Sequence, residues 1–156
     1  MESVLAALEA TSIASTLRAS RWGYAAVNTA HILGFSLLIG AIIPLNLRLL
    51  GLWPHVPIEA LARILVPVAA TGLILAIAAG ALLFSVRAEE YAALDVFRLK
   101  LVLIAVGALS ALELHRLYGM RLAGATQGRR TAHALISIAC WTGAIVCGRL
   151  IAFTID

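Results

Sequence analysis

The sequence predicts an all-α integral membrane protein: a four-helix up-down-up-down bundle, preceded by a short N-terminal helix at the membrane interface. Of the 156 residues, 62% are hydrophobic and 13% are charged, which is too little polar surface for a soluble domain. The apolar residues gather in stretches that reach the ~20 residues a helix needs to cross the hydrocarbon core. Short connections join these stretches, so we expect consecutive helices to be antiparallel neighbours.

Residues 3–18 are predicted to form an amphipathic helix that lies along the membrane surface. The apolar residues of this segment recur at helical spacing: Val4, Leu5, Leu8, Ile13 and Leu17. A partly ordered tail is the alternative. The segment is unlike a cleavable signal peptide, because it carries Glu2 and Glu9 and lacks a basic start.

Four spans are predicted over residues 22–50, 58–86, 95–118 and 131–155. Aromatic anchors and helix breakers mark their ends. Pro67 and Gly72 predict a bend in the second span. The third span has a short uncharged centre, because Lys100 and Glu113 enclose residues 101–112. We assign all 156 residues to a single transmembrane domain.

The distribution of Lys and Arg predicts how the bundle is oriented. One side of the membrane receives six of these residues: Arg48, Arg63, Arg116, Arg121, Arg129 and Arg130. The other side receives five, diluted by acidic residues. We therefore expect both termini on the outer, periplasmic side of a bacterial inner membrane. The net charge of +4 lies at span ends, and in the absence of a phosphate-binding loop or basic helix we expect no nucleic-acid partner.

Ionisable side chains at membrane depth are the first functional candidates, because placing them in lipid is costly. His31 lies nine residues into span one, Lys100 about five into span three, and Arg149 about six from the outer end of span four. Asn28 is one turn from His31 on the same helix face. These four residues are expected in the outer half of the bundle. The alternatives are a packed, hydrogen-bonded His31 and a Lys100 that snorkels to the boundary.

His115 and His133 form a second group, in the inner half of the bundle, with Glu113 beside them. A short connection joins spans three and four, so the two imidazoles come to one level. Two histidines at matched depth on adjacent antiparallel helices suit axial ligation of a haem iron, and Arg116 and Arg129 are placed to pair with haem propionates. The alternative is that both histidines face lipid head groups.

Span four carries a second pattern, in which His133, Cys140 and Cys147 are spaced by seven residues and drift slowly around one helix face. Thiolate and imidazole suit Cu(I), so copper is the alternative cofactor. A heptad step is ~10.5 Å along a helix, too long for three side chains to hold one ion, and cysteine also serves as a small packing residue.

Two segments carry a resemblance to known families. The first lies in span one and reads VNTAHILGFSLLIGAIIPLNLRLLG. It contains a His, then Leu-Gly, then an apolar run to a Gly, and an Arg at the inner end. This pattern resembles the first-helix motif of CopD-type copper-resistance membrane proteins and of HemJ-type protoporphyrinogen oxidases. The second lies in span three and reads FRLKLVLIAVGALSALELHRLYG. It is similar to a helix of the HemJ group that begins with Lys-Leu and carries a His toward its end. The layout over residues 20–118 looks like that of a family of small bacterial inner-membrane proteins.

The resemblance implies a haem b, with His31 and Lys100 at positions implicated in haem binding and His115 at a further histidine. It also implies a redox role or copper handling. Some basic and aromatic residues of the HemJ-type pattern are not identifiable in this chain. Protoporphyrinogen oxidation does not follow from likeness of fold alone.

Our leading interpretation is a haem b protein that passes electrons between a quinone or haem partner and a protein on the outer face. His31 and Lys100 would line an outer haem site, with Arg149 toward its propionates, and His115 and His133 an inner or single alternative site. Copper transport or tolerance without haem is a second interpretation. A third is a structural anchor for a partner subunit, and the chain is also compatible with a homo-oligomer.

Overall fold

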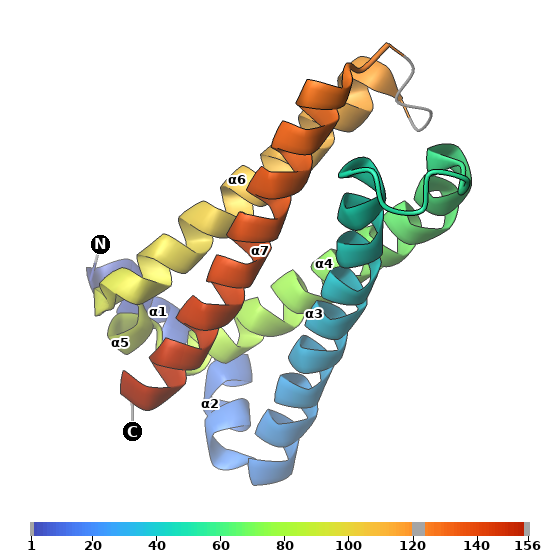
Figure 1. The fold of residues 1–156 in the computed structure, drawn as a ribbon. Helices are drawn as coiled ribbons and strands as arrows, with labels where there is room; N and C mark the ends of the chain where they lie inside the picture. Colours follow the sequence, from blue (N-terminus) through green and yellow to red (C-terminus); the bar gives the residue numbers. More distant parts are fainter. Residues whose placement is uncertain (1, 120–123, 155–156) are drawn as a thin grey trace.

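Seven helices make up the part of the chain that this computed structural model describes, residues 2–119 and 124–154 (Figure 1). They are α1 (Glu2–Glu9), α2 (Ser12–Ala19), α3 (Arg21–Leu49), α4 (Ile58–Val86), α5 (Ala88–Ala93), α6 (Asp95–Tyr118) and α7 (Gln127–Thr154). Of the described residues, 89% are helical and none lies in a strand. The all-α prediction is confirmed for this part of the chain.

The four long helices occupy the predicted ranges. α3 agrees with the first range to within one residue, and α4 and α6 have the bounds predicted for the second and third. α7 begins at Gln127, four residues before its predicted start. The hydroxyl of Thr126 explains the earlier start, because it accepts a hydrogen bond from the Arg129 amide at the new helix end. Ile155 and Arg121 lie outside the described residues.

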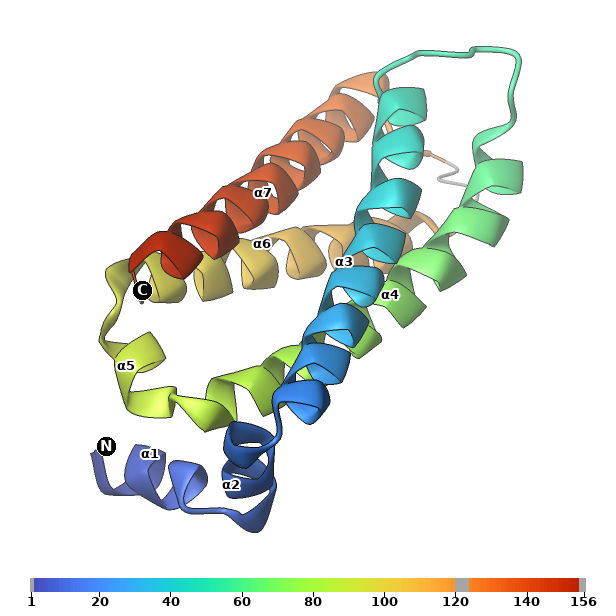
Figure 2. The same ribbon diagram turned by 90° about the horizontal axis from the view of Figure 1, so that it is seen from below.

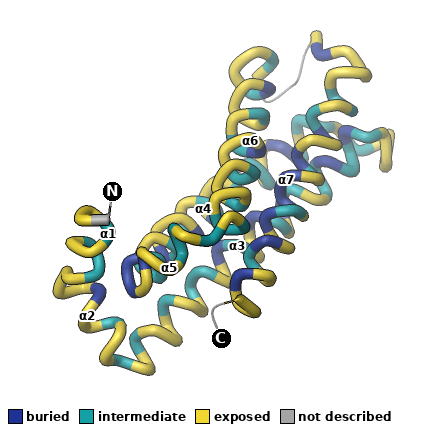
Figure 3. The backbone as a smooth tube through the Cα atoms, turned by 90° about the vertical axis from the view of Figure 1, so that its left-hand side faces the viewer, coloured by how far each residue is buried: buried dark blue, intermediate teal, exposed yellow. Residues whose placement is uncertain are grey.

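Three of these helices, α3, α4 and α7, are long and apolar enough to cross a membrane, judged by length and composition. α6 has 24 residues but carries charges toward both ends, so the fourth span stays a prediction. Large apolar side chains are exposed on all four helices, among them Ile32, Ile74, Leu109 and Phe153, and Figure 3 shows exposed residues along most of their outer faces. An apolar outer surface is typical of helices that face lipid.

The N-terminal segment forms two helices where the sequence predicts one over residues 3–18. The break falls at Thr11, whose Oγ1 donates to the carbonyl of Leu8 and accepts from the amide of Ala14. The side chain thus replaces the backbone hydrogen bonds that a continuous helix would make at this point. That either helix lies at a membrane interface stays a prediction.

α1 and α2 pack on the corner between α4 and α5. Arg18 donates to the carbonyl oxygens of Val86 (2.9 Å) and Glu9 (3.2 Å). The Glu9 carboxylate accepts from the Glu89 amide at 2.8 Å. These bonds satisfy backbone groups at the end of α4 and the start of α5, which would otherwise lack partners within their helices, and Ala14 is fully buried beside them.

α3 and α4 approach most closely at Gly34 and Gly72. A Cβ on Gly34 would lie 2.6 Å from the amide nitrogen of Ala76, and a Cβ on Gly72 would lie 2.6 Å from the carbonyl oxygen of Gly34. Only glycine allows two backbones to come this close, as in membrane helix pairs joined by small residues. α4, which contains Pro67, changes direction along its length (Figure 2), as predicted.

α6 and α7 form the second antiparallel pair, again through glycines. A Cβ on Gly107 of α6 would lie 3.2 Å from the ring of Trp141, and a Cβ on Gly143 of α7 would lie 2.9 Å from the side chain of Leu103. Each glycine therefore receives a large side chain from the other helix. The chain consists of two such hairpins, α3–α4 and α6–α7.

Among the described residues, the backbones of the two hairpins approach each other most closely between α3 and α7. Within the same part of the chain, the backbone of α4 approaches neither that of α6 nor that of α7 closely, and α4 and α6 are linked by side chains alone. The expectation that consecutive helices are antiparallel neighbours is therefore not confirmed for α4 and α6. The short helix α5, which was not predicted, joins these two helices at one end. We call the end that carries the α3–α4 and α6–α7 connections the loop end, and the opposite end, with α1, α2 and α5, the terminal end.

The glycine crossing gives a first test. We expect Gly72→Ala to lower the free energy of unfolding by about 1–3 kcal/mol, because the added methyl group must push two backbones apart. The measurement is reversible unfolding in mixed micelles. Gly40→Ala is the matched control on α3, since a Cβ there meets nothing within 4 Å. Equal stability of the two variants would contradict the close crossing.

Candidate functional site

His31 lies on α3, and its imidazole reaches across to α4. Nδ1 is 2.8 Å from the carbonyl oxygen of Ala76. The ring fits there because Gly80 has no side chain: a Cβ on Gly80 would lie 3.0 Å from Cε1 of His31. A carbonyl oxygen only accepts hydrogen bonds, so Nδ1 carries a proton, and in the neutral ring Nε2 keeps its lone pair. A backbone carbonyl that holds one ring nitrogen is the arrangement that orients metal-binding histidines.

Lys100 lies on α6 and packs against α7. Its Nζ would be 3.4 Å from a Cβ on Gly148, so this glycine makes room for the ammonium group. The ammonium group is close enough to interact electrostatically with Cys147 and, in the other hairpin, with His31. Lys100 is half-buried and takes part in none of the ion pairs between described residues. Within the described chain this cation has no carboxylate partner.

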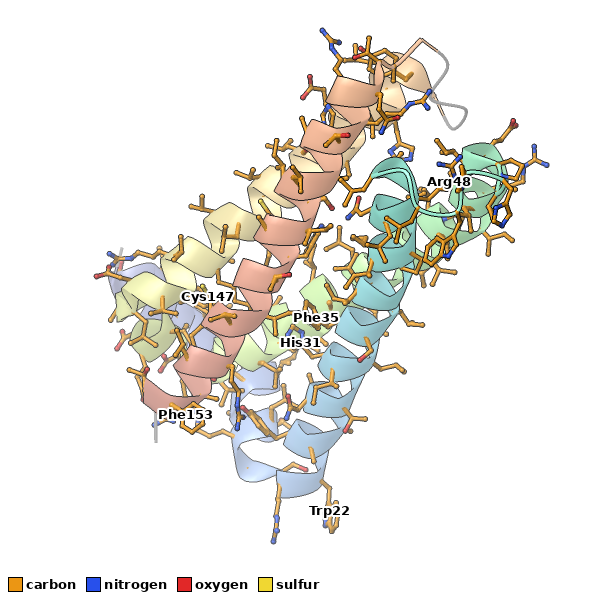
Figure 4. The ribbon with its side chains drawn as sticks, in the orientation of Figure 1. Trp22, His31, Phe35, Arg48, Cys147 and Phe153 are labelled. Atoms are coloured by element: carbon orange, nitrogen blue, oxygen red, sulfur yellow. The ribbon has the colours of Figure 1, made fainter. Side chains whose placement is uncertain are left out.

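His31 and Lys100 therefore belong to different hairpins and lie within electrostatic range of each other. Figure 4 shows His31 and Phe35 on the face of α3 that is turned toward α4 and α7, and Cys147 on α7. The sequence predicts the shared depth of His31 and Lys100, and the structure adds the direction of the His31 ring toward α4.

An aromatic cluster of Phe84, Tyr91 and Phe97 lies next to these two residues at the terminal end. The rings of Phe84 and Phe97 stack with centroids 5.2 Å apart, and Tyr91 lies 5.9 Å from Phe97. Phe84 follows Gly80 by one turn of α4, and Phe97 precedes Lys100 by one turn of α6, so the stack joins α4 to α6 beside the site. This cluster was not predicted, although the one-turn spacings of Phe84 from Gly80 and of Phe97 from Lys100 can be read from the sequence.

Tyr91, which lies outside the long helices, closes the cluster toward the terminal end. Burial raises the pKa of the Tyr91 phenol above its ordinary value, and a hydrogen bond with Tyr24 adds to the shift. The phenol is therefore neutral at physiological pH.

Asn28 and Arg149 were expected beside His31. Asn28 is exposed on α3. Arg149 is also exposed, and its guanidinium lies over the ring of Phe153, 4.6 Å from the ring centroid. Neither residue shares a hydrogen bond or an ion pair with His31 or Lys100, so the described structure does not join them to the site.

His115 and His133 lie together near the loop end. His115 Nδ1 is 2.8 Å from the carbonyl oxygen of Ala111 in its own helix, and His133 Nδ1 is 2.8 Å from the hydroxyl of Ser110 on α6. Both histidines line a cavity of about 60 Å³. Glu113 is exposed instead on another face of α6, where it lines a surface groove with Arg116.

A buried hydrogen bond borders the same cavity: Asn46 of α3 donates from Nδ2 to the hydroxyl of Ser137 on α7, at 2.9 Å. Both residues are buried. Asn46, Ser110 and Ser137 were not predicted as site residues, although each is a polar residue inside an apolar stretch of the sequence. We name the space lined by Asn46, Ser110, His115, His133 and Ser137 the loop-end cavity.

The loop-end cavity is small. Its volume is about 60 Å³, whereas ligand pockets are ~300–1,000 Å³, so water-sized guests fit it as it stands and a haem does not. A haem site at His115 and His133 stays a prediction. Near His31 the chain offers a ring nitrogen with a lone pair and an ammonium group that has no carboxylate partner among the described residues. These groups are of the kinds that suit a haem iron and a propionate.

Cys140 and Cys147 are buried free thiols on α7. Cys140 packs against Gly107, whose added Cβ would lie 3.3 Å from that of the cysteine. Among the described residues no group of three or more His, Cys, Asp or Glu side chains is placed to hold a metal ion. Packing accounts for the position of Cys140, and the copper alternative stays a prediction.

Comparison of the chain with protein-family models, with curated proteins and with solved structures found no match. The function is therefore argued from the site itself.

The Asn46–Ser137 bond gives a second test. We expect Asn46→Ala to lower the free energy of unfolding by about 1–3 kcal/mol. The substitution removes the buried hydrogen-bond partner of Ser137, and with it a link between the two hairpins. Asn28→Ala is the matched control, since Asn28 is exposed, and it should change stability by less than about 0.5 kcal/mol. Unfolding in mixed micelles measures both. If Asn46→Ala left the free energy of unfolding unchanged, the Asn46–Ser137 hydrogen bond would not hold the hairpins together.

Proposed function

We propose that the chain is a haem b-binding protein of the bacterial inner membrane that transfers electrons between a quinone or haem partner in the membrane and a protein on the outer face. The observation that carries the proposal is that His31 and Lys100, on two different hairpins, lie within electrostatic range of each other. One supplies an imidazole whose Nδ1 is held by the Ala76 carbonyl, and the other a half-buried cation with no carboxylate partner in the described chain.

Each of these residues suits one part of a haem. The Nε2 lone pair of His31 is the group that would hold the iron, since neutral imidazole is a common axial ligand. The Lys100 ammonium would attract a propionate, because an unpaired cation at membrane depth is stabilised by an anion. The bound haem supplies a one-electron couple. The Phe84–Phe97 stack would shield one edge of the site from water.

The membrane arrangement is part of the proposal. α6 would be the fourth span, with Lys100 and Glu113 near its two boundaries. The basic loop end would face the cytoplasm, as Lys and Arg do in inner-membrane proteins, and both termini the periplasm. The site then lies nearer the outer face, where Arg149 would be free to leave Phe153 and approach a propionate or an acidic partner protein.

The optical spectrum tests the haem. Protein expressed with haem supplied and purified from membranes should show the α-band of a b-type haem in the reduced-minus-oxidised spectrum. His31→Ala should lose most of this band, because the iron loses its ligand. His55→Ala is the matched control, since His55 lies exposed in the α3–α4 connection. An unchanged band in His31→Ala, or no band in the parent protein, would refute the proposed site.

The charge of Lys100 gives a separate test. Lys100→Met should weaken haem binding by roughly tenfold or more, in line with ~1.5–3 kcal/mol for a hydrogen bond to a charged group. Lys100→Arg keeps the charge and should retain most of the affinity. Haem titration of the apoprotein, followed by absorbance, measures all three proteins. Equal affinities for Lys100→Met and the parent would exclude a propionate contact at Lys100.

A further inference from the structure

The loop-end cavity lies far from the His31 site and takes no part in the proposed haem chemistry. It is formed where three helices meet: α3 contributes Asn46, α6 contributes Ser110 and His115, and α7 contributes His133 and Ser137. The other lining residues are apolar: Ile42, Leu45, Leu49, Ala111 and Leu114. Leu49 and Leu114 also pack with Ala134 in a buried apolar cluster. A wholly apolar core would be expected where three helices meet, so the polar residues of the lining call for an explanation.

The lining offers hydrogen-bond acceptors to whatever occupies the cavity. His115 Nδ1 is 2.8 Å from the Ala111 carbonyl, so it carries the proton and Nε2 is an acceptor. Asn46 Nδ2 donates to Ser137, and its Oδ1 is a second acceptor. A guest in the cavity can therefore donate hydrogen bonds to these two atoms, and the hydroxyls of Ser110 and Ser137 can donate to it or accept from it.

Charge and size further limit which guests the cavity can hold. None of the described residues that line it is acidic, so a cation would find no carboxylate partner there. Water is neutral, donates and accepts hydrogen bonds, and is small enough for a cavity of about 60 Å³.

The cavity also has a route to the aqueous boundary. His115 is only half-buried and lies three residues from Tyr118, where α6 ends. Ser137 is buried and lies ten residues beyond the start of α7 at Gln127, or about 15 Å along the helix. The polar lining thus extends from the loop end to a depth at which lipid-facing positions are dry.

We propose that the loop-end cavity is the closed end of a water path, through which water, and protons moving along its hydrogen bonds, reach Ser137 from the loop-end side of the membrane. Ser110, His133 and Ser137 continue the path as hydroxyl and imidazole groups that both donate and accept. The path does not depend on a bound haem, so it stands or falls separately from the proposed function.

Cysteine accessibility tests the path, because a thiol reacts as thiolate and thiolate forms in contact with water. The variant is Ser137→Cys in a Cys140→Ala, Cys147→Ala background, treated in membrane vesicles with a small water-soluble methanethiosulfonate. The matched control is Ser36→Cys in the same background, since Ser36 is exposed on the outer face of α3 and would face lipid. We expect Ser137→Cys to react at least tenfold faster than Ser36→Cys.

A second substitution makes the result specific to the cavity. Asn46→Leu places an apolar side chain at the lining and should reduce the labelling of Ser137→Cys to the rate of the Ser36→Cys control. If Ser137→Cys fails to fold, as judged by gel filtration, Ser110→Cys lines the same cavity and replaces it. Labelling no faster than at Ser36→Cys, or labelling unaffected by Asn46→Leu, would overturn the proposal.

Discussion

The contact of Gly34 with Gly72 is the constraint on which the rest of the structure depends. It brings the backbones of α3 and α4 so close that a Cβ on either residue would lie 2.6 Å from a backbone atom of the other helix. At that separation the His31 ring, one turn away on α3, reaches the Ala76 carbonyl over Gly80. The orientation of the imidazole is therefore a consequence of helix packing, and it requires no ligand to be established.

The arrangement of the two hairpins explains why polar groups gather where they do. α3 and α7 hold the hairpins together, with the Asn46–Ser137 bond at the loop end. α4 and α6 remain apart along most of their length and are linked by the Phe84–Phe97 stack at the terminal end. The proposed cofactor beside His31 and the proposed water path at the loop end would thus occupy different parts of the molecule.

The sequence predicts the ends of the long helices well, because breakers such as Pro54 and the polar connections determine them. It does not predict α5 or the break at Thr11, which depend on contacts between Glu9 and Glu89 and on side-chain capping. For the site, residue spacing gives depth along a helix but not rotation about its axis. Depth places His31 with Lys100 and His115 with His133, whereas Asn28 and Arg149 have suitable depth and are exposed.

The account depends most directly on the state of the His31 ring before any cofactor binds. Nitrogen-15 NMR of histidine-labelled, haem-free protein in lipid reports which ring nitrogen is protonated, and a carbon-13 label at the Ala76 carbonyl identifies its partner. The account predicts a proton on Nδ1, a through-space contact with Ala76, and an unprotonated Nε2. A proton fixed on Nε2, or an imidazole with no contact to Ala76, would contradict it.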